Sequence, residues 1–249
     1  YNRIRTNPEL PVVPRTFLFA GKAAPAYRLA KLIIKFINNI AATIDVDPAV
    51  AGWLRVVFLP EYCVSLAERL IPASDVSNQI STAGFEASGT SNRKFLMNGA
   101  LTLGTRDGAT IEMAEEAGEE NFFLFGLTAG EVAERQARGY RPMEIYEQNG
   151  ELREALDFIA SGALADGDFN LFRPLLANLL RSAPFLVLAD YQTYVDCQEQ
   201  VSARWRDAET WTRHSILNVA RMGKFSSDRS IREYCGQIWH AKPVPANKA

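Results

Sequence analysis

A lysine that follows a glycine-rich turn is the residue of this sequence with the clearest chemical potential. Lys94 stands in EASGTSNRKFLMNG (residues 86–99), just after a Gly-Thr-Ser turn. Such a turn offers free backbone N–H groups, and the start of a helix carries partial positive charge, so the stretch could hold an anion such as phosphate. A lysine beside a phosphate site can hold a phosphorylated cofactor covalently. The alternative is a solvated lysine in the first turn of an ordinary helix, because Gly-Ser-Asn turns often precede helices.

The composition offers few other catalytic groups. The chain has 249 residues, is 47% hydrophobic and carries a formal net charge of −2, which gives no reason to expect a nucleic acid or a membrane as partner. Its three cysteines form no C-x-x-C pair, so we expect no metal site or disulfide framework and a reducing, cytoplasmic setting. Of the two histidines, His214 is interpreted as a helix-surface or packing residue. No apolar run approaches the length of a membrane span.

Short apolar runs alternate with helical patterns in the first half of the chain. Strands are predicted at residues 16–20, 54–59, 76–80, 100–103 and 122–125. Between the first two, apolar residues from Leu29 to Ile44 recur with the helical period. The pattern indicates an α/β fold with a doubly wound parallel sheet, in which ligands bind at the carboxyl ends of the strands. Beyond about residue 131 the chain is predicted to be mostly helical, with one more strand at residues 185–190.

Four longer stretches carry a resemblance to a known family. They are FAGKAAPAYRLAK, FLPEYCVSLAERLIPASDVSNQISTAG, EASGTSNRKFLMNGALTLGTRDGATIEMAEEAGEENFFLFG and GKFSSDRSIREY. Together they closely resemble the C-terminal part of the α-glucan phosphorylases, over nearly the whole chain. That family has two Rossmann-like domains facing a cleft. The resemblance implies that residues 1–249 are the C-terminal, cofactor-binding domain, without the N-terminal domain and without the first central strand of the sheet.

The resemblance also implies an activity. The complete enzyme would cleave α-1,4-glucan with inorganic phosphate to give α-glucose 1-phosphate, with pyridoxal 5'-phosphate as cofactor, and would be a homodimer. In this family the phosphate of the cofactor exchanges a proton with the substrate phosphate. A basic segment that precedes YNRI in the family is absent here, so the isolated chain is expected to be inactive. Two alternatives remain open, a folded non-catalytic fragment and a domain of a nucleotide-sugar glycosyltransferase.

The family's functional residues map onto this sequence position by position. Lys94 would anchor the cofactor, and the turn before it would bind the cofactor phosphate. Glu86 and the backbone of the residues after it would bind sugar hydroxyls, although Glu86 could instead cap the following turn. The remaining pocket positions could equally be packing or surface residues. The predicted cofactor residues are Tyr62, Val64, Gln79, Gly89, Thr90, Ser91 and Lys94, and the predicted substrate residues are Glu86, Ala87, Ser88 and Gly89.

The sequence departs from the family at four positions near these residues. Cys63 replaces an arginine and Arg93 a methionine, which would move positive charge around the phosphates unless Arg93 faces solvent. Phe85 and Thr110 replace a threonine and an asparagine. Lys22 is expected to face the same cleft, with no contact assigned to it. The acidic run at residues 112–120 is interpreted as a solvated turn, and SSDR at 226–229 as an N-cap serine or aspartate that opens the last helix.

Overall fold

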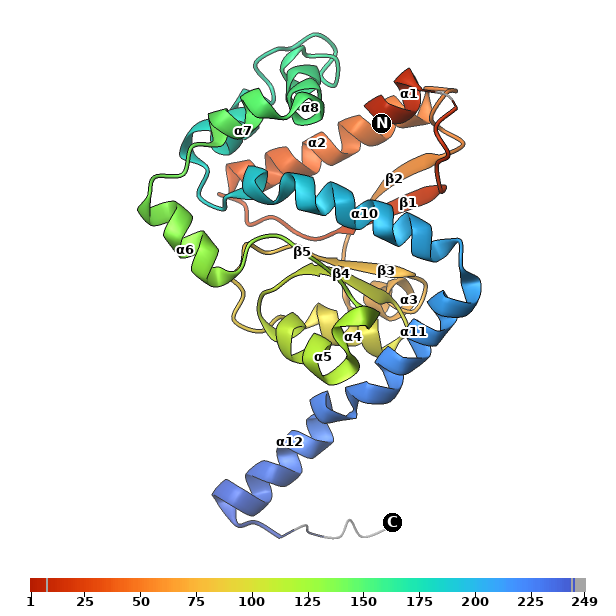
Figure 1. Cartoon of the computed structure of the whole chain (residues 1–249), viewed down its shortest axis with the longest axis vertical. Coiled ribbons are helices and arrows are strands. Elements are labelled where there is room, and N and C mark those ends of the chain that lie inside the picture. Colours follow the sequence, from red (N-terminus) through yellow and green to blue (C-terminus); the bar gives the residue numbers. More distant parts are fainter. Residues whose placement is uncertain (8, 243, 245–249) are drawn as a thin grey trace.

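The computed structural model describes residues 1–7, 9–242 and 244 of the chain. Its strands are β1 (Arg15–Ala20), β2 (Leu54–Leu59), β3 (Val76–Gln79), β4 (Leu101–Thr105) and β5 (Phe123–Phe125). The helices of the first half are α1 (Asn2–Thr6), α2 (Arg28–Asp45), α3 (Val64–Leu70), α4 (Ser91–Met97) and α5 (Ala109–Ala117). Those of the second half are α6 (Ala129–Ala137), α7 (Pro142–Gln148), α8 (Gly150–Ala160), α9 (Arg173–Ala177), α10 (Tyr191–Trp205), α11 (Ala208–Arg221) and α12 (Ser227–Glu233) (Figure 1).

The strands form two parallel sheets rather than one. β1 pairs with β2 over their full length, and β4 pairs with β3 on one side and β5 on the other. The α/β class and the parallel pairing are therefore confirmed, whereas a single continuous sheet is absent from the described residues. Within those residues β1, β2, β3 and β5 each have one edge without a neighbouring strand.

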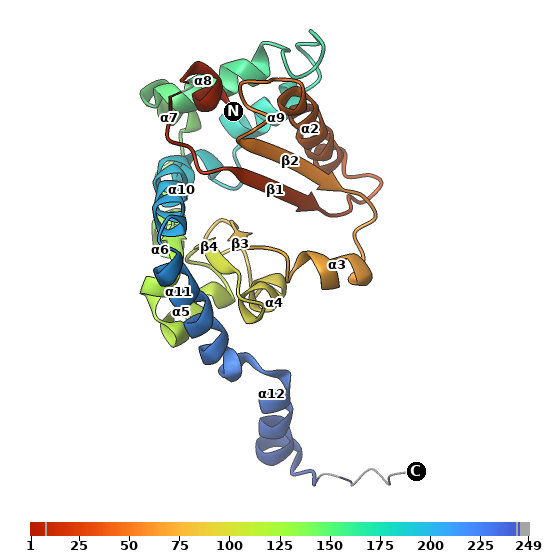
Figure 2. The same ribbon diagram turned by 90° about the vertical axis from the view of Figure 1, so that its right-hand side faces the viewer.

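Helix α10 connects the two sheets. Its buried residues Cys197 and Val201 pack in one cluster with Leu101, Leu103, Phe123 and Phe125 of the second sheet. On the other side, Arg15 at the start of β1 donates to the carbonyl of Gln198 at 2.9 Å and to the hydroxyl of Ser202 at 2.8 Å. Figure 1 shows α10 crossing the molecule between β1 and β2 on one side and β3, β4 and β5 on the other, and Figure 2 shows it upright beside both sheets. The helix therefore ties together two sheets that exchange no backbone hydrogen bonds.

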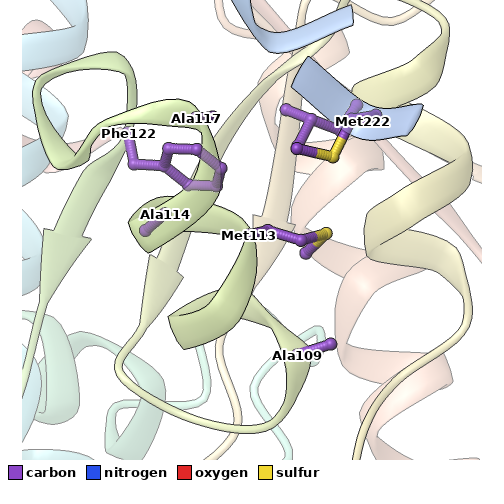
Figure 3. Close-up of a cluster of buried hydrophobic side chains, with 7 residues drawn as sticks. Ala109, Met113, Ala114, Ala117, Phe122 and Met222 are labelled. Carbon is purple, nitrogen blue, oxygen red and sulfur yellow. The ribbon is translucent and has the colours of Figure 1, made fainter. Parts of the chain in front are cut away.

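A second buried cluster lies under α5, close to the Lys94 helix. Leu96 of α4 belongs to this cluster, and its residues are between 0% and 7% exposed. Figure 3 shows Met113, Phe122 and Met222 of the same cluster. The acidic run falls on this element, so the prediction of a turn at residues 112–120 is wrong for most of its length. Residues up to Ala117 continue α5, and a short 3₁₀ helix follows at Glu119–Asn121. The buried Met113, Ala114 and Ala117 explain the helix, because they share the face that packs while the glutamates stay exposed.

The strand predicted at residues 185–190 is also wrong. Val187–Asp190 form a 3₁₀ helix, and Leu186 before it has a positive φ of 47°. The apolar run is nevertheless buried, with Leu186 and Leu188 at 2% and 4% exposed. Its last residue, Asp190, accepts a hydrogen bond from the backbone N–H of Leu127 at 2.8 Å, and burial raises the pKa of this carboxyl. Burial alone does not require a strand, because a compact turn covers the same apolar surface.

The C-terminal helices follow the prediction closely. His214 on α11 is 7% exposed, and its Nε2 lies 2.6 Å from Nη1 of Arg204, so it is a packing residue. Burial and the nearby Arg204 charge lower the pKa of His214, which favours the neutral imidazole. The last helix begins at Ser227 as expected, without a side-chain cap from Ser226, and extends away from the sheets (Figure 2). Within the described residues no helix combines the length and apolar character needed to cross a bilayer.

Candidate functional site

The candidate site is built on the loop that connects β3 to α4. The loop leaves the carboxyl end of β3 after Gln79 and enters α4 at Ser91. Gly89 has a φ of +85°, and a Cβ at this position would lie 2.9 Å from Nδ2 of Asn92, so both backbone angle and space require glycine. Within the described chain, the backbone N–H groups of Gly89, Thr90 and Ser91 donate no hydrogen bond to another backbone group. These are the free donors that an anion needs.

Asp107 holds this loop in place. Its carboxylate, 6% exposed, accepts hydrogen bonds from the hydroxyl of Ser81 at 2.7 Å and from the backbone N–H groups of Gly84 at 2.8 Å and Glu86 at 2.9 Å. Burial by itself would raise the pKa of Asp107, but these hydrogen bonds outweigh it and the pKa lies below its usual value. The carboxylate thus takes the place of a neighbouring strand or turn as partner for the loop backbone.

The next residue, Gly108, allows the loop to approach this closely. It has a φ of +52°, and a Cβ here would lie 2.8 Å from the carbonyl oxygen of Ser88. That carbonyl accepts from the backbone N–H of Ala109 at 2.8 Å, at the start of α5. Asp107 and Gly108 are not among the site residues that the sequence predicts. The available signal was the Asp-Gly pair directly after β4, since such pairs mark tight turns.

Gln79 fixes the beginning of α4 to the end of β3. Its Nε2 donates to the hydroxyl of Ser77 at 2.9 Å and to that of Ser91 at 3.3 Å. Lys94 lies one helical turn after Thr90 and is exposed, so its amine is accessible. The structure therefore places Gln79 against Ser91 at the start of the short helix that carries Lys94, and the cofactor role of these residues stays a prediction. An accessible lysine beside free N–H donors is a donor set that fits the aldehyde and phosphate groups of pyridoxal phosphate.

Tyr62 and Val64 lie on a different segment, around the start of α3. Tyr62 is half-buried and Val64 is 76% exposed. In the described part of the chain, neither hydrogen-bonds to the Glu86–Lys94 segment. Cys63 between them contacts the hydroxyl of Ser65 at 3.2 Å. This hydrogen bond, with smaller contributions that include the Lys22 charge, lowers the pKa of the Cys63 thiol. The loops after β1 and β2 leave the same end of the sheet, because Ala20 pairs with Leu59.

The substrate-binding residues predicted from the resemblance are all on the loop surface. Glu86 and Ala87 are exposed and Ser88 is half-buried. Oε1 of Glu86 accepts from the backbone N–H of Ser88 at 3.4 Å, so the carboxylate partly serves its own turn and retains acceptor capacity. Phe85 packs edge to face on Phe185 with ring centroids 5.8 Å apart, which explains how an aromatic residue is accommodated here.

Arg93 does not face solvent. It is half-buried, and its guanidinium donates to the hydroxyl of Ser88 and to the carbonyl of Gly89, the latter at 3.1 Å. The alternative stated for this departure from the family is therefore wrong. Among the described residues, no group of three or more His, Cys, Asp or Glu side chains gathers as metal ligands do.

Comparison with known proteins identifies the family of this chain. The sequence model of the carbohydrate phosphorylases matches residues 1–241. The chain belongs to this family. It is 58% identical over 244 residues to a glycogen phosphorylase of Synechocystis sp., and 51% identical over 243 residues to the muscle form of Oryctolagus cuniculus and the brain form of Mus musculus.

Each of these alignments covers 98% of the chain and 29% of the relative. The chain therefore spans less than a third of the length of the phosphorylases that it matches. Glycogen phosphorylases are glycosyltransferases of carbohydrate metabolism, and the phosphorylase family generally uses pyridoxal phosphate. All three cysteines of this phosphorylase chain are free.

Replacing Asp107 with asparagine should lower the free energy of unfolding by roughly 2 kcal/mol at neutral pH. The variant loses the hydrogen bonds to a buried charge, and its side-chain NH₂ group lies against backbone and hydroxyl groups that are themselves donors. Since folding lowers the pKa of Asp107, its contribution is complete above the unfolded pKa of about 3.9 and is lost as pH falls through the folded pKa. Urea denaturation across pH 7 to 3 measures this. Asp75→Asn, at an exposed aspartate before β3, is the control. A difference between the Asp107 variant and wild type that grows on acidification would contradict the assignment.

Proposed function

We propose that this chain is the cofactor-bearing C-terminal part of an α-1,4-glucan phosphorylase that forms α-glucose 1-phosphate from glucan and inorganic phosphate. The observation that carries the proposal is the free N–H donors of the Gly89–Ser91 turn one helical turn from the accessible Lys94. The family match supports it, and no observation favours a nucleotide-sugar glycosyltransferase. The homodimer and the cytoplasmic setting expected from the sequence belong to this same proposal.

Each residue of the loop has a proposed task. Lys94 holds the cofactor covalently through its amine, and the turn donates N–H groups to the cofactor phosphate. When bound, the cofactor supplies a phosphate that exchanges a proton with the substrate phosphate. Glu86 accepts hydrogen bonds from sugar hydroxyls with the acceptor capacity that Ser88 leaves free. Gln79 keeps Ser91 in register with the end of β3, and Tyr62 and Val64 form a further wall of the cofactor pocket.

The unpaired edges of β1 and β3 among the described residues extend the same proposal. β1 and β3 each present an unpaired edge in the described chain, and α10 holds both sheets in one body. We infer that in the complete enzyme a parallel strand from outside this chain lies between them and makes one doubly wound sheet. Such a strand would satisfy backbone groups that otherwise face solvent or solvent-filled space.

Reduction with borohydride after addition of pyridoxal phosphate should fix a pyridoxyl group on Lys94, because its amine is accessible beside a phosphate-binding turn. Peptide mapping by mass spectrometry locates the label. Lys94→Ala should lose it, and Lys35→Ala, at an exposed lysine on α2, should keep it. A label on another lysine, with Lys94 unmodified in the full-length protein, would rule out the anchor.

Glu86→Gln in the full-length protein should raise the KM for glucose 1-phosphate in the glucan-forming direction by roughly tenfold or more, because a charged acceptor contributes about 1.5–3 kcal/mol. The absorbance of the bound cofactor should not change. Glu115→Gln, at an exposed glutamate on α5, is the matched control. If the Glu86 variant loses the cofactor instead, Glu86 serves the turn and the proposed sugar contact is wrong.

The 249-residue chain by itself should show no phosphorolysis of maltodextrin, even with pyridoxal phosphate added. Two phosphates must be held against a sugar in a closed cleft, and their mutual repulsion is strong at low effective dielectric. The chain supplies one wall of that cleft. Release of glucose 1-phosphate is measured beside the full-length protein, and turnover by the isolated chain within about tenfold of it would show that the catalytic groups are misassigned.

A further inference from the structure

Arg93 stands out among the charged residues near the candidate site because, in the described chain, the hydrogen bonds of its guanidinium both go to the loop. One guanidinium nitrogen, Nη2, donates both to the hydroxyl of Ser88 and to the carbonyl of Gly89. The side chain belongs to α4, three residues into the helix, and reaches back over the turn that precedes it. It therefore connects the helix that carries Lys94 to the segment proposed to bind sugar.

The charge of Arg93 has no acidic partner. Among the described residues, no carboxylate lies within ion-pair distance of its guanidinium, although seven other such pairs are present. Its Nε is buried and donates no hydrogen bond. Burying part of an arginine without a counter-ion is unfavourable. Two effects would offset this unfavourable free energy: hydrogen bonds that fix the conformation of the loop, and a bound ligand with negative charge.

The backbone around Ser88 is held from the opposite side by other groups. The Ser88 carbonyl accepts from the N–H of Ala109 at 2.8 Å and from Nδ2 of Asn92 at 3.3 Å. Arg93 donates to the Ser88 hydroxyl and to the Gly89 carbonyl, and the Ser88 hydroxyl also donates to that carbonyl at 3.4 Å. Both carbonyls are thereby occupied, which leaves the N–H groups of Gly89, Thr90 and Ser91 as the free polar groups of this backbone.

We propose that Arg93 is a positioning residue that fixes the Ser88–Gly89 turn with its N–H donors available to bound phosphate and its loop in place for the sugar. The inference rests on the proposed function and goes beyond it, because it gives Arg93 the task of fixing the backbone conformation of the turn. A planar guanidinium suits this task, since it presents several N–H groups in a fixed arrangement. A methionine, which the resemblance led us to expect here, offers no donor.

The test uses Arg93→Met and Arg93→Lys in the full-length protein, with Arg69→Met at an exposed arginine of α3 as control. Arg93→Met should raise the KM for glucose 1-phosphate by roughly tenfold and change kcat by less than about threefold, because the loss of one or two charge-assisted hydrogen bonds loosens the turn. Arg93→Lys keeps the charge and loses the planar arrangement of donors, so it should recover only a small part of the affinity.

A second readout uses the chain as it stands. Hydrogen exchange of the Ala109 amide, which donates to the Ser88 carbonyl of the turn, should accelerate about tenfold or more in Arg93→Met, while the β4 amides and the urea midpoint remain those of the control. Equal acceleration throughout the chain, an unchanged KM, or full recovery by lysine would each overturn the positioning role. Failure of the proposed function is distinguishable, because borohydride would then leave Lys94 unlabelled in the wild-type protein too.

Discussion

The buried carboxylate of Asp107 is the interaction on which the geometry of the candidate site depends. A loop that connects a parallel strand to a helix has backbone donors that no sheet partner satisfies. Here a single charged acceptor takes the donors of Ser81, Gly84 and Glu86, and the glycine after it lets the loop come within contact distance. The carboxylate remains charged despite its burial because these hydrogen bonds favour the ionised form. The Gly89 turn and Lys94 are consequently presented from a fixed base.

Within the described residues, the two sheets are connected by a helix and not by backbone hydrogen bonds between their strands. Cys197 and Val201 of α10 are buried against the second sheet. Arg15 of the first sheet donates hydrogen bonds to the Gln198 carbonyl and the Ser202 hydroxyl of the same helix. Side-chain packing and these hydrogen bonds connect the two sheets where no backbone ladder joins β1 to β3 in the described chain. The open edges are consistent with a chain that spans 29% of its relatives, since the complement of a parallel strand need not be close in sequence.

The sequence predicts those parts of the fold and the site whose signals are local. Strands β1, β2 and β4, helix α2 and the Gly89 turn were readable because alternation, helical periodicity and turn residues act over a few positions. The strand predicted at residues 185–190 is wrong because an apolar segment indicates burial but does not determine the backbone conformation. Asp107 was not found because its partners lie 21 to 26 residues upstream, and no local pattern records that a carboxylate will turn toward them.

The departures at positions 63 and 93 are best understood together with their surroundings. At position 63 the chain carries a thiol near the Lys22 charge, and at position 93 an arginine without a carboxylate partner in the described chain. The arginine is fixed by the Ser88 hydroxyl and the Gly89 carbonyl, so the positive charge stands at the turn itself. Coulomb attraction falls with distance and is strongest where water is excluded. In the proposed function, a cation built into the turn would favour phosphate through the same contacts that set the backbone, so that one side chain would supply both geometry and charge.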